Sequence, residues 1–253
     1  MTDSNQDMLA ALQAELAAVR AEMQEFSATV SHDLRAPLRH IVSYAQLVQE
    51  DAGPQLDAEV QGFLSTIVDS ARHMGVLLDG LSALSRIGTL PLVWEQVPLR
   101  TLVQDVCESL SVTATGTPVD WRIDDDLPTV RADQEVLRQA LVQVLGNAAK
   151  FSAGRERPVV TISRAVESQA GCDTLLVHDN GAGFNPALHG RLFKVFGRLH
   201  SAQQFEGVGM GLALTRKLLQ RLDATVALEG AVDAGCTVQL CFRSARAADD
   251  RMT

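Results

Sequence analysis

Apolar residues at the start of the chain repeat with the period of an amphipathic helix. They follow one another at alternating steps of three and four residues, which is the spacing of a coiled-coil seam. This seam consists of Leu9, Leu12, Leu16, Val19, Met23, Phe26 and Val30. Because such a seam needs an apolar partner, the pattern predicts a helix that forms a dimeric coiled coil. The alternative is a single amphipathic helix lying on a core.

The helical pattern is interrupted at residues 51–54 and then resumes. Asp51-Ala-Gly-Pro54 contains glycine and proline together, which are the strongest signals for a turn. A second apolar stripe follows from about Asp57 to Arg86. Two long antiparallel helices joined by a short turn cannot bury their stripes alone. The pattern therefore predicts an antiparallel helical hairpin that pairs with a second copy in a dimeric four-helix bundle.

Beyond Gly88 short β-like runs alternate with helical stretches, which predicts an α/β sandwich and makes the whole chain an α+β protein. The expected strands cover residues 92–97, 119–123, 159–163, 174–178, 225–228 and 237–242. The expected helices cover residues 99–110, 133–151 and 209–222. The predicted organisation is a coiled-coil signalling helix over 1–25, the hairpin over 26–88, the sandwich over 92–243 and a disordered tail over 244–253.

Composition limits the class of protein. Of the 253 residues, 46% are hydrophobic, which is enough to bury a core. The net charge of −9 argues against nucleic acid as a partner, because a phosphate backbone needs a basic surface. No apolar run approaches the roughly 18 residues needed to cross a bilayer, and the polar N-terminus is not a secretory signal. A cytoplasmic protein without membrane insertion is therefore expected.

The cysteines lack CxxC or zinc spacing and are expected to be reduced and mostly buried: Cys107, Cys172, Cys236 and Cys241.

His32 lies two residues beyond the seam residue Val30, which is about 200° around a helix and points it outward. An exposed imidazole can attack an electrophilic phosphorus near neutral pH. Asp33 beside it is placed to hold the other ring N–H or to accept a proton. Pro37 cannot donate the helical hydrogen bond and is predicted to kink the helix. The alternative is an inert surface histidine.

One face of the expected helix over 133–151 carries Gln143, Asn147 and Lys150. An amide oxygen there can ligate Mg²⁺, and a lysine one turn further on can meet a phosphate. The alternative is a polar stripe on a surface helix.

Two glycine-marked turns follow. Asp179 ends an expected strand, where its carboxylate can accept a hydrogen bond from the amine of a base, while Gly181 and Gly183 let the backbone approach the ring. A plain Asp-Asn-Gly turn is the alternative. Gly207-Val-Gly-Met-Gly211 precedes a helix, whose free N–H groups suit phosphate oxygens, although this pattern alone is weak and lacks the GK[ST] of a P-loop. Residues 185–206, here called the lid segment, are expected to close over a nucleotide.

In this order the segments resemble the H, N, G1, F and G2 boxes of two-component sensor histidine kinases. The matching segments are His-Asp-Leu-Arg-Ala-Pro-Leu-Arg, Asn-Ala-Ala-Lys-Phe, Asp-Asn-Gly-Ala-Gly-Phe, Phe-Lys-Val-Phe-Gly-Arg-Leu-His and Gly-Val-Gly-Met-Gly-Leu. The first and fourth are closest to the phytochrome-like branch, and the resemblance spans residues 20–243. It implies a homodimeric phosphotransfer hairpin followed by a Bergerat-type ATP-binding domain. It further implies autophosphorylation from Mg-ATP and transfer to an aspartate in the receiver domain of a response regulator.

The resemblance also implies roles for individual residues. His32 would be the phosphoacceptor, with Asp33 as its assisting acid or base. Asn147 would ligate Mg²⁺ together with Gln143. Lys150 and Arg198 would contact phosphates, Asp179 would read adenine, and Thr237 would be the threonine on the adenine side. The full set of ATP-binding residues would be Asn147, Lys150, Asp179, Gly181, Gly183, Arg198, Gly207, Gly209, Gly211 and Thr237.

The chain departs from the family pattern at two positions. The family usually has asparagine where this chain has Gln143, and the related MutL and Hsp90 ATPases need a glutamate there. Since an amide cannot take a proton, ATP hydrolysis as the main activity is not expected. A pseudokinase scaffold remains the non-enzymatic alternative.

Ala36 stands where members that dephosphorylate their partner usually carry Thr or Asn, so weak phosphatase activity is expected. No sensor domain fits before residue 26, so the input is expected from a separate upstream sensor protein or from the rest of a longer chain.

Overall fold

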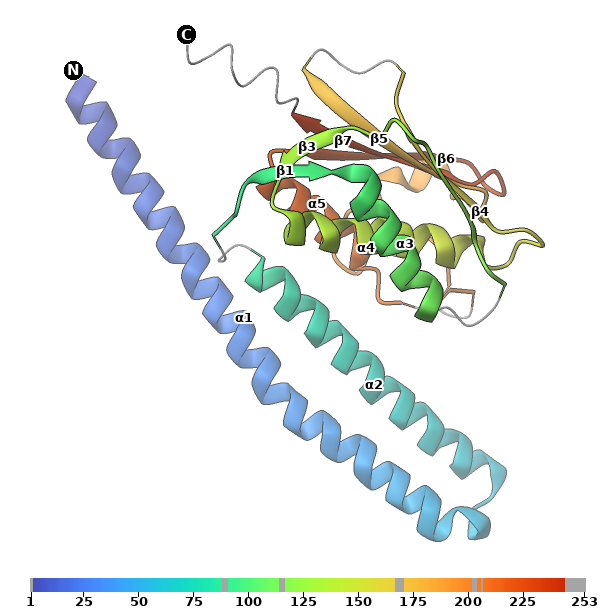
Figure 1. Cartoon of the computed structure of the whole chain (residues 1–253). Coiled ribbons are helices and arrows are strands. Elements are labelled where there is room, and N and C mark those ends of the chain that lie inside the picture. Colours follow the sequence, from blue (N-terminus) through green and yellow to red (C-terminus); the bar gives the residue numbers. More distant parts are fainter. Residues whose placement is uncertain are drawn as a thin grey trace. The chain divides into compact units, whose positions relative to one another are not determined.

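The computed structural model describes residues 2–87, 91–113, 117–166, 171–201, 204–205 and 207–243 (Figure 1). The predicted tail over 244–253 and the side chain of Leu9 lie outside this description. The chain splits into two compact units, Met1–Leu90 and Pro91–Thr253. Within the described residues, no helix combines the length and the apolar character that crossing a membrane requires.

The first unit is a helical hairpin, as predicted. Helix α1 covers Thr2–Ala52, a short 3₁₀ turn η1 covers Gly53–Gln55, and helix α2 covers Ala58–Arg86. Asp57 caps α2, since its carboxylate accepts a hydrogen bond of 2.8 Å from the backbone N–H of Val60. Helix α1 continues on both sides of Pro37, and the kink expected there stays a prediction.

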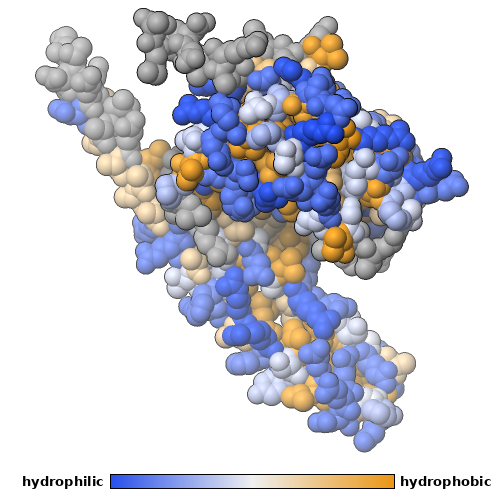
Figure 2. Space-filling view, in the orientation of Figure 1, coloured by the Kyte–Doolittle hydropathy of each residue, from blue (hydrophilic) through white to orange (hydrophobic). Residues whose placement is uncertain are grey.

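The two helices of the hairpin bury only part of their apolar stripes against each other. Ala45, Val68 and Ala71 are buried, whereas large apolar side chains on both helices are exposed. Figure 2 shows hydrophobic residues reaching the surface along both helices. These exposed residues include Leu34, Ile41, Val60, Phe63, Ile67 and Met74.

The second unit is a two-layer α/β sandwich, which confirms the predicted fold class. Its elements are β1 (Glu95–Pro98), α3 (Leu99–Thr113), β2 (Asp120–Ile123), β3 (Thr129–Ala132), α4 (Gln134–Ser152), β4 (Val159–Arg164), β5 (Cys172–Asp179), η2 (Pro186–Arg191), α5 (Gly211–Arg221), β6 (Thr225–Gly230) and β7 (Cys236–Arg243). Five strands form a sheet in the order β2-β4-β5-β7-β6, in which only β2 and β4 are parallel, and β1 pairs with β3 separately. Helices α3, α4 and α5 lie on one face of the sheet (Figure 1).

The core of this unit lies between the sheet and helix α4. Leu137, Leu141 and Leu145 recur every fourth residue along α4 and are fully buried. Burying each of them contributes about 2 kcal/mol relative to an exposed side chain. Asp133 caps the same helix by accepting hydrogen bonds from the backbone N–H groups of Val136 and Val93. Helix α4 is thus fixed at its start and along its buried face, which positions the polar residues on its other face.

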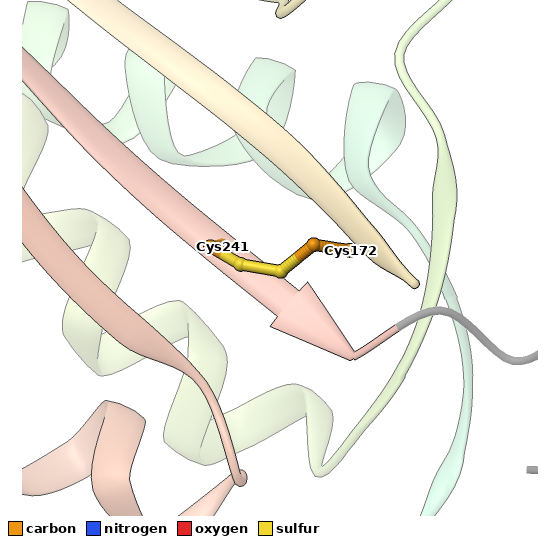
Figure 3. The surroundings of a disulfide bond; sticks show 2 residues. All are labelled: Cys172 and Cys241. Atoms are coloured by element: carbon orange, nitrogen blue, oxygen red, sulfur yellow. A yellow bond between two sulfur atoms is a disulfide. The ribbon is translucent and has the colours of Figure 1, made fainter. Parts of the chain in front are cut away.

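The expectation of reduced cysteines is wrong for one pair. Cys172 of β5 and Cys241 of β7 form a disulfide, with their Cα atoms 5.9 Å apart (Figure 3). The register pairs Thr174 with Cys241, so the two cysteines are diagonal neighbours on adjacent strands. They are 69 residues apart in the sequence, and only the sheet brings them together. The other two cysteines, Cys107 and Cys236, are free thiols, and Cys107 is buried.

Candidate functional site

The side chain of His32 is 84% exposed on helix α1, which confirms its predicted outward orientation. Its Nδ1 atom lies 3.2 Å from a carboxylate oxygen of Asp33. A carboxylate at Nδ1 favours the tautomer with the proton on that nitrogen and leaves the lone pair on Nε2. Within the described part of the chain no hydrogen bond to Nε2 is found. The pair therefore presents a nucleophilic nitrogen to solvent.

Helix α4 brings Gln143, Asn147 and Lys150 together, as their spacing predicts. Asn147 Oδ1 accepts a hydrogen bond of 3.2 Å from Lys150 Nζ. Helix α5 begins against the two amides, since a Cβ atom at Gly211 would lie 3.0 Å from Gln143 Oε1 and 3.3 Å from Asn147 Nδ2. The start of α5 thus lies next to the polar face of α4.

Two cations, Lys150 and Arg198, lie near the polar face of α4 and the glycine-rich loop. Burial lowers the pKa of Lys150, and the positive charge of Arg198 lowers it further. Lys150 Nζ lies 4.3 Å from the centre of the Phe151 ring and close to Gly207, where a Cβ atom would be 3.6 Å from it. Because burial and the charge of Arg198 disfavour the charged form of Lys150, a bound polyanion would stabilise the lysine charge. The arrangement suits phosphate groups.

Arg198 binds the loop that precedes α5. Its guanidinium donates hydrogen bonds to the backbone carbonyls of Gly207 and Phe205. Gly209 has a φ of +74°, and a Cβ atom there would lie 2.6 Å from the carbonyl oxygen of Gly197. The lid segment and the glycine-rich loop therefore pack closely, and in this structure Arg198 holds the loop.

Asp179 is buried at the end of β5. Its Oδ1 accepts a hydrogen bond of 2.9 Å from the backbone N–H of Gly181. Burial raises the pKa of Asp179, although hydrogen bonds from the backbone N–H groups of Gly181 and Cys236 oppose this rise. The following turn approaches its surroundings closely, because a Cβ atom at Gly183 would lie 1.8 Å from the carbonyl oxygen of Ala231. The carboxylate is thus oriented by backbone donors in a tight turn.

The structure does not bring Thr237 to Asp179. Thr237 is paired with His178, and its hydroxyl lies 3.0 Å from His178 Nδ1. Asp179 is paired with Cys236 instead, and successive residues of a strand face opposite sides of the sheet. Burial raises the pKa of the Cys236 thiol to about 12, and the charge of Asp179 raises it too. Cys236 is therefore the residue of β7 that lies beside Asp179, one position away from the residue expected from the sequence.

Sequence reasoning also missed a cluster of three rings. Phe151 at the end of α4 lies 5.4 Å from His200 and 4.9 Å from Phe205, measured between ring centres. His200 Nε2 is 2.9 Å from the carbonyl oxygen of Gly183. The cluster connects the lid segment to α4 and to the turn after Asp179. Its aromatic residues are visible in the sequence, but their contacts depend on the fold.

Two family models match the chain. The His Kinase A (phospho-acceptor) domain matches residues 22–90. The domain described as Histidine kinase-, DNA gyrase B-, and HSP90-like ATPase matches residues 132–246. The first match includes His32, and the second includes the amides of α4, Asp179 and the glycine-rich loop.

Several known proteins are similar over most of this chain. Cyanobacterial phytochrome A from Nostoc sp. (strain PCC 7120) is 30% identical over 234 residues, which are 91% of this chain and 30% of that protein. Sensor histidine kinase AruS from Pseudomonas aeruginosa is 33% identical over 231 residues, 87% of this chain and 22% of that protein. The chain thus spans less than a third of the length of either relative.

The solved structures agree on the architecture. Full-length ShkA in complex with AMPPNP is similar with a TM-score of 0.60 and 27% identity, over 87% of this chain and 46% of that one. The histidine kinase AdeS of Acinetobacter baumannii has a TM-score of 0.55 at 20% identity, over 85% of this chain and 98% of that one. The second likeness shows the fold alone.

Proposed function

Because the chain belongs to the sensor histidine kinases, we propose that it phosphorylates its own His32 with ATP and passes the phosphoryl group to an aspartate in the receiver domain of a response regulator. The observation that carries this proposal is the exposed imidazole of His32 with Asp33 at its Nδ1 atom. Such a ring is a ready acceptor for phosphorus, because its Nε2 lone pair faces solvent.

The second unit would bind the nucleotide. The buried carboxylate of Asp179 would accept a hydrogen bond from the amine of adenine, in a pocket shaped by Gly181 and Gly183. Lys150 and the backbone N–H groups at the start of α5 would contact the phosphates. Arg198 would join them if its guanidinium left the carbonyls that it binds here. Cys236 replaces Thr237 as the proposed neighbour of the adenine reader on β7.

The donors present fit a magnesium ion that arrives with the nucleotide. Gln143 and Asn147 supply amide oxygens beside the start of α5, and Mg²⁺ prefers oxygen ligands and retains several waters. Among the described residues, no group of three or more His, Cys, Asp or Glu side chains is placed to hold a metal. When bound, Mg²⁺ would neutralise phosphate charge. The two amides would hold it together with the phosphates.

The transfer itself needs little covalent chemistry from the protein. The Nε2 lone pair would attack the γ-phosphorus in line, and a P–N bond would form as the bond to the bridging oxygen breaks and ADP leaves. The proton on Nδ1 would stay shared with Asp33, whose negative charge offsets the charge that develops on the ring. Positioning of the two reactants would supply most of the rate.

The hairpin would act as a homodimer in the cytoplasm. The exposed apolar residues of both helices, such as Ile41, Phe63 and Ile67, would pack against a second copy in a four-helix bundle. Residues 1–25 would continue as a coiled coil that receives a signal from an upstream sensor, residues 26–88 would carry phosphotransfer, and residues 92–243 would bind ATP. Ala36 has no polar side-chain atom to orient a water, so we expect weak phosphatase activity on the regulator.

A catalytically weak pseudokinase scaffold is the second candidate, and Gln143 is the observation that favours it. The longer amide lies close to Gly211, where a Cβ atom would be 3.0 Å from its oxygen. If Gln143 in this position did not bind the metal, the protein would bind partners without turnover.

Incubation with γ-labelled ATP separates the two candidates. We expect the full chain to take up label that is stable to base and lost in acid, and both His32→Ala and Asn147→Ala to reduce this label to background. His40→Ala is the matched control, because His40 is another exposed histidine of α1, and it should retain the label. Labelling of the His32→Ala variant at the parent level would refute the assignment of the phosphoacceptor. Binding of ATP without any labelling of the parent would favour the scaffold.

A further inference from the structure

The side chain of Arg155, just beyond the end of α4, donates hydrogen bonds to three backbone carbonyl groups in two separate turns. Its Nε donates to the carbonyl of Asn180 at 2.8 Å. Its Nη2 donates to the carbonyls of Gly181, at 2.8 Å, and Asp233, at 2.9 Å. Only a planar guanidinium offers several donors in a fixed fork, so lysine cannot reproduce this pattern. Arg155 thereby joins the turn after β5 to the turn between β6 and β7.

Each of the two turns contains a residue with a positive φ, a conformation that the surrounding contacts help to stabilise. Gly183 has a φ of +60°, and Asp233, which is not glycine, has a φ of +61°. The backbone N–H of Asp233 donates a hydrogen bond of 2.8 Å to the carbonyl of Ala182. Asp233 Oδ1 also lies 3.6 Å from Arg155 Nη2. Each turn therefore depends on the other, and Arg155 contacts both.

One peptide group connects Arg155 to the Asp179 carboxylate. The carbonyl of Asn180 and the N–H of Gly181 belong to the same planar peptide unit. Arg155 binds the carbonyl end of this unit, and the N–H end donates to Asp179 Oδ1 at 2.9 Å. A charged donor on the carbonyl polarises the peptide and strengthens the hydrogen bond at its other end. The guanidinium thus fixes the direction of the N–H that orients the carboxylate.

We propose that Arg155 is a positioning residue for recognition of the base: through the Asn180–Gly181 peptide it holds the Asp179 carboxylate in the orientation that accepts the amine of adenine. This inference rests on the proposed binding of ATP by Asp179. Arg155 donates to backbone carbonyls of the two turns, so it would act on the nucleotide through the orientation of Asp179. The other contacts of this region keep the turn folded, because the side chain of Asn180 is separately bound to Val159 N–H and to the Arg157 carbonyl.

The test compares binding of ATP and GTP to the full chain by calorimetry. Loss of hydrogen bonds from a charged donor should weaken ATP binding about tenfold in both Arg155→Ala and Arg155→Lys. GTP has no exocyclic amine at the same ring position, so its binding should change little. The ratio of ATP affinity to GTP affinity should therefore fall. Asp179→Asn is the reference for loss of base recognition. Arg164→Ala is the matched control, since Arg164 forms an ion pair of 3.1 Å with Asp173 on the same sheet, and it should keep the parent ratio of ATP to GTP affinity.

The ratio of ATP to GTP affinity distinguishes positioning from a merely structural role. A structural defect lowers the folded fraction and weakens both nucleotides equally, so an unchanged ratio in the folded Arg155 variants would overturn the inference. Circular dichroism of each variant shows whether it is folded, and Arg155→Lys decides by the same criterion if Arg155→Ala does not fold. A parent protein that binds ATP and GTP equally would instead refute the role proposed for Asp179.

Discussion

The two units of the chain complete their apolar cores in different ways. In the α/β unit the large side chains of α4, such as Leu141 and Leu145, are fully buried between helix and sheet. In the hairpin, Phe63 and Ile67 remain exposed although they belong to the predicted apolar stripe. One unit therefore completes its core within a single chain, whereas the other leaves apolar side chains exposed, which we assign to the interface of the proposed dimer. Stability of the first should not depend on protein concentration, and stability of the second should.

The largest effect is expected in the α/β core. Leu141→Ala removes a fully buried side chain and should lower the free energy of unfolding of this unit by about 3 to 5 kcal/mol, because the cavity cannot collapse in a packed interior. Both tryptophans, Trp94 and Trp121, lie in the α/β unit, so their fluorescence follows it selectively during denaturant unfolding. The midpoint should be the same at low and high protein concentration. A loss below about 1 kcal/mol would mean that the site can repack.

This core and the hairpin turn were accessible from sequence for the same reason. Both rest on short-range patterns: the i, i+4 spacing of Leu137 and Leu141, and the Gly53-Pro54 pair that ends α1. The start of the second helix at about Asp57 was predicted, and the cap that the structure adds there is also local, since its partner is three residues away. Features that depend on residues a few positions apart leave a pattern in the sequence, which is why the helices could be predicted.

Contacts between distant segments could not be predicted in this way. The register of β5 and β7 places Cys236, not Thr237, beside Asp179, and a shift of one residue reverses the face of the sheet. The disulfide between Cys172 and Cys241 depends on the same register. Arg155 shows no motif in the sequence, because its partners are backbone carbonyls of two turns. Strand β3 is absent from the expected strands, because it is a strand only through its pairing with β1, some thirty residues earlier in the chain.

A smaller effect, on dimerisation, should distinguish the exposed apolar residues of the hairpin from those of the α/β unit. Ile67→Ala removes part of the surface that we assign to the dimer and should weaken dimerisation by about 2 kcal/mol, counted over both copies. Sedimentation over a range of concentrations measures this change. Val166→Ala is the control, because Val166 is fully exposed on the α/β unit, and it should not alter the dimer. Equal behaviour of the two variants would show that the exposed stripe of the hairpin is not an interface.

The smallest expected effect is a pH dependence of nucleotide affinity, which arises from Asp179 in the α/β unit. Burial raises the pKa of Asp179 above the ordinary value of 3.8, so on acidification its carboxylate takes up a proton before an exposed aspartate does. A protonated Asp179 is a poorer acceptor for the amine of adenine, and ADP affinity should fall about tenfold as the pH drops through the raised pKa. The contribution of this group to stability has the opposite sign: the folded state binds the proton more tightly than the unfolded chain, so acidification through the same range favours folding. The asparagine side chain in Asp179→Asn does not titrate, so this variant should lose the part of the pH dependence of binding that Asp179 causes. Any pH dependence that remains comes from protonation of the nucleotide or of other groups. Calorimetry with ADP on the parent and on Asp179→Asn measures the difference, and parallel pH profiles for the two proteins would show that Asp179 does not contact the base.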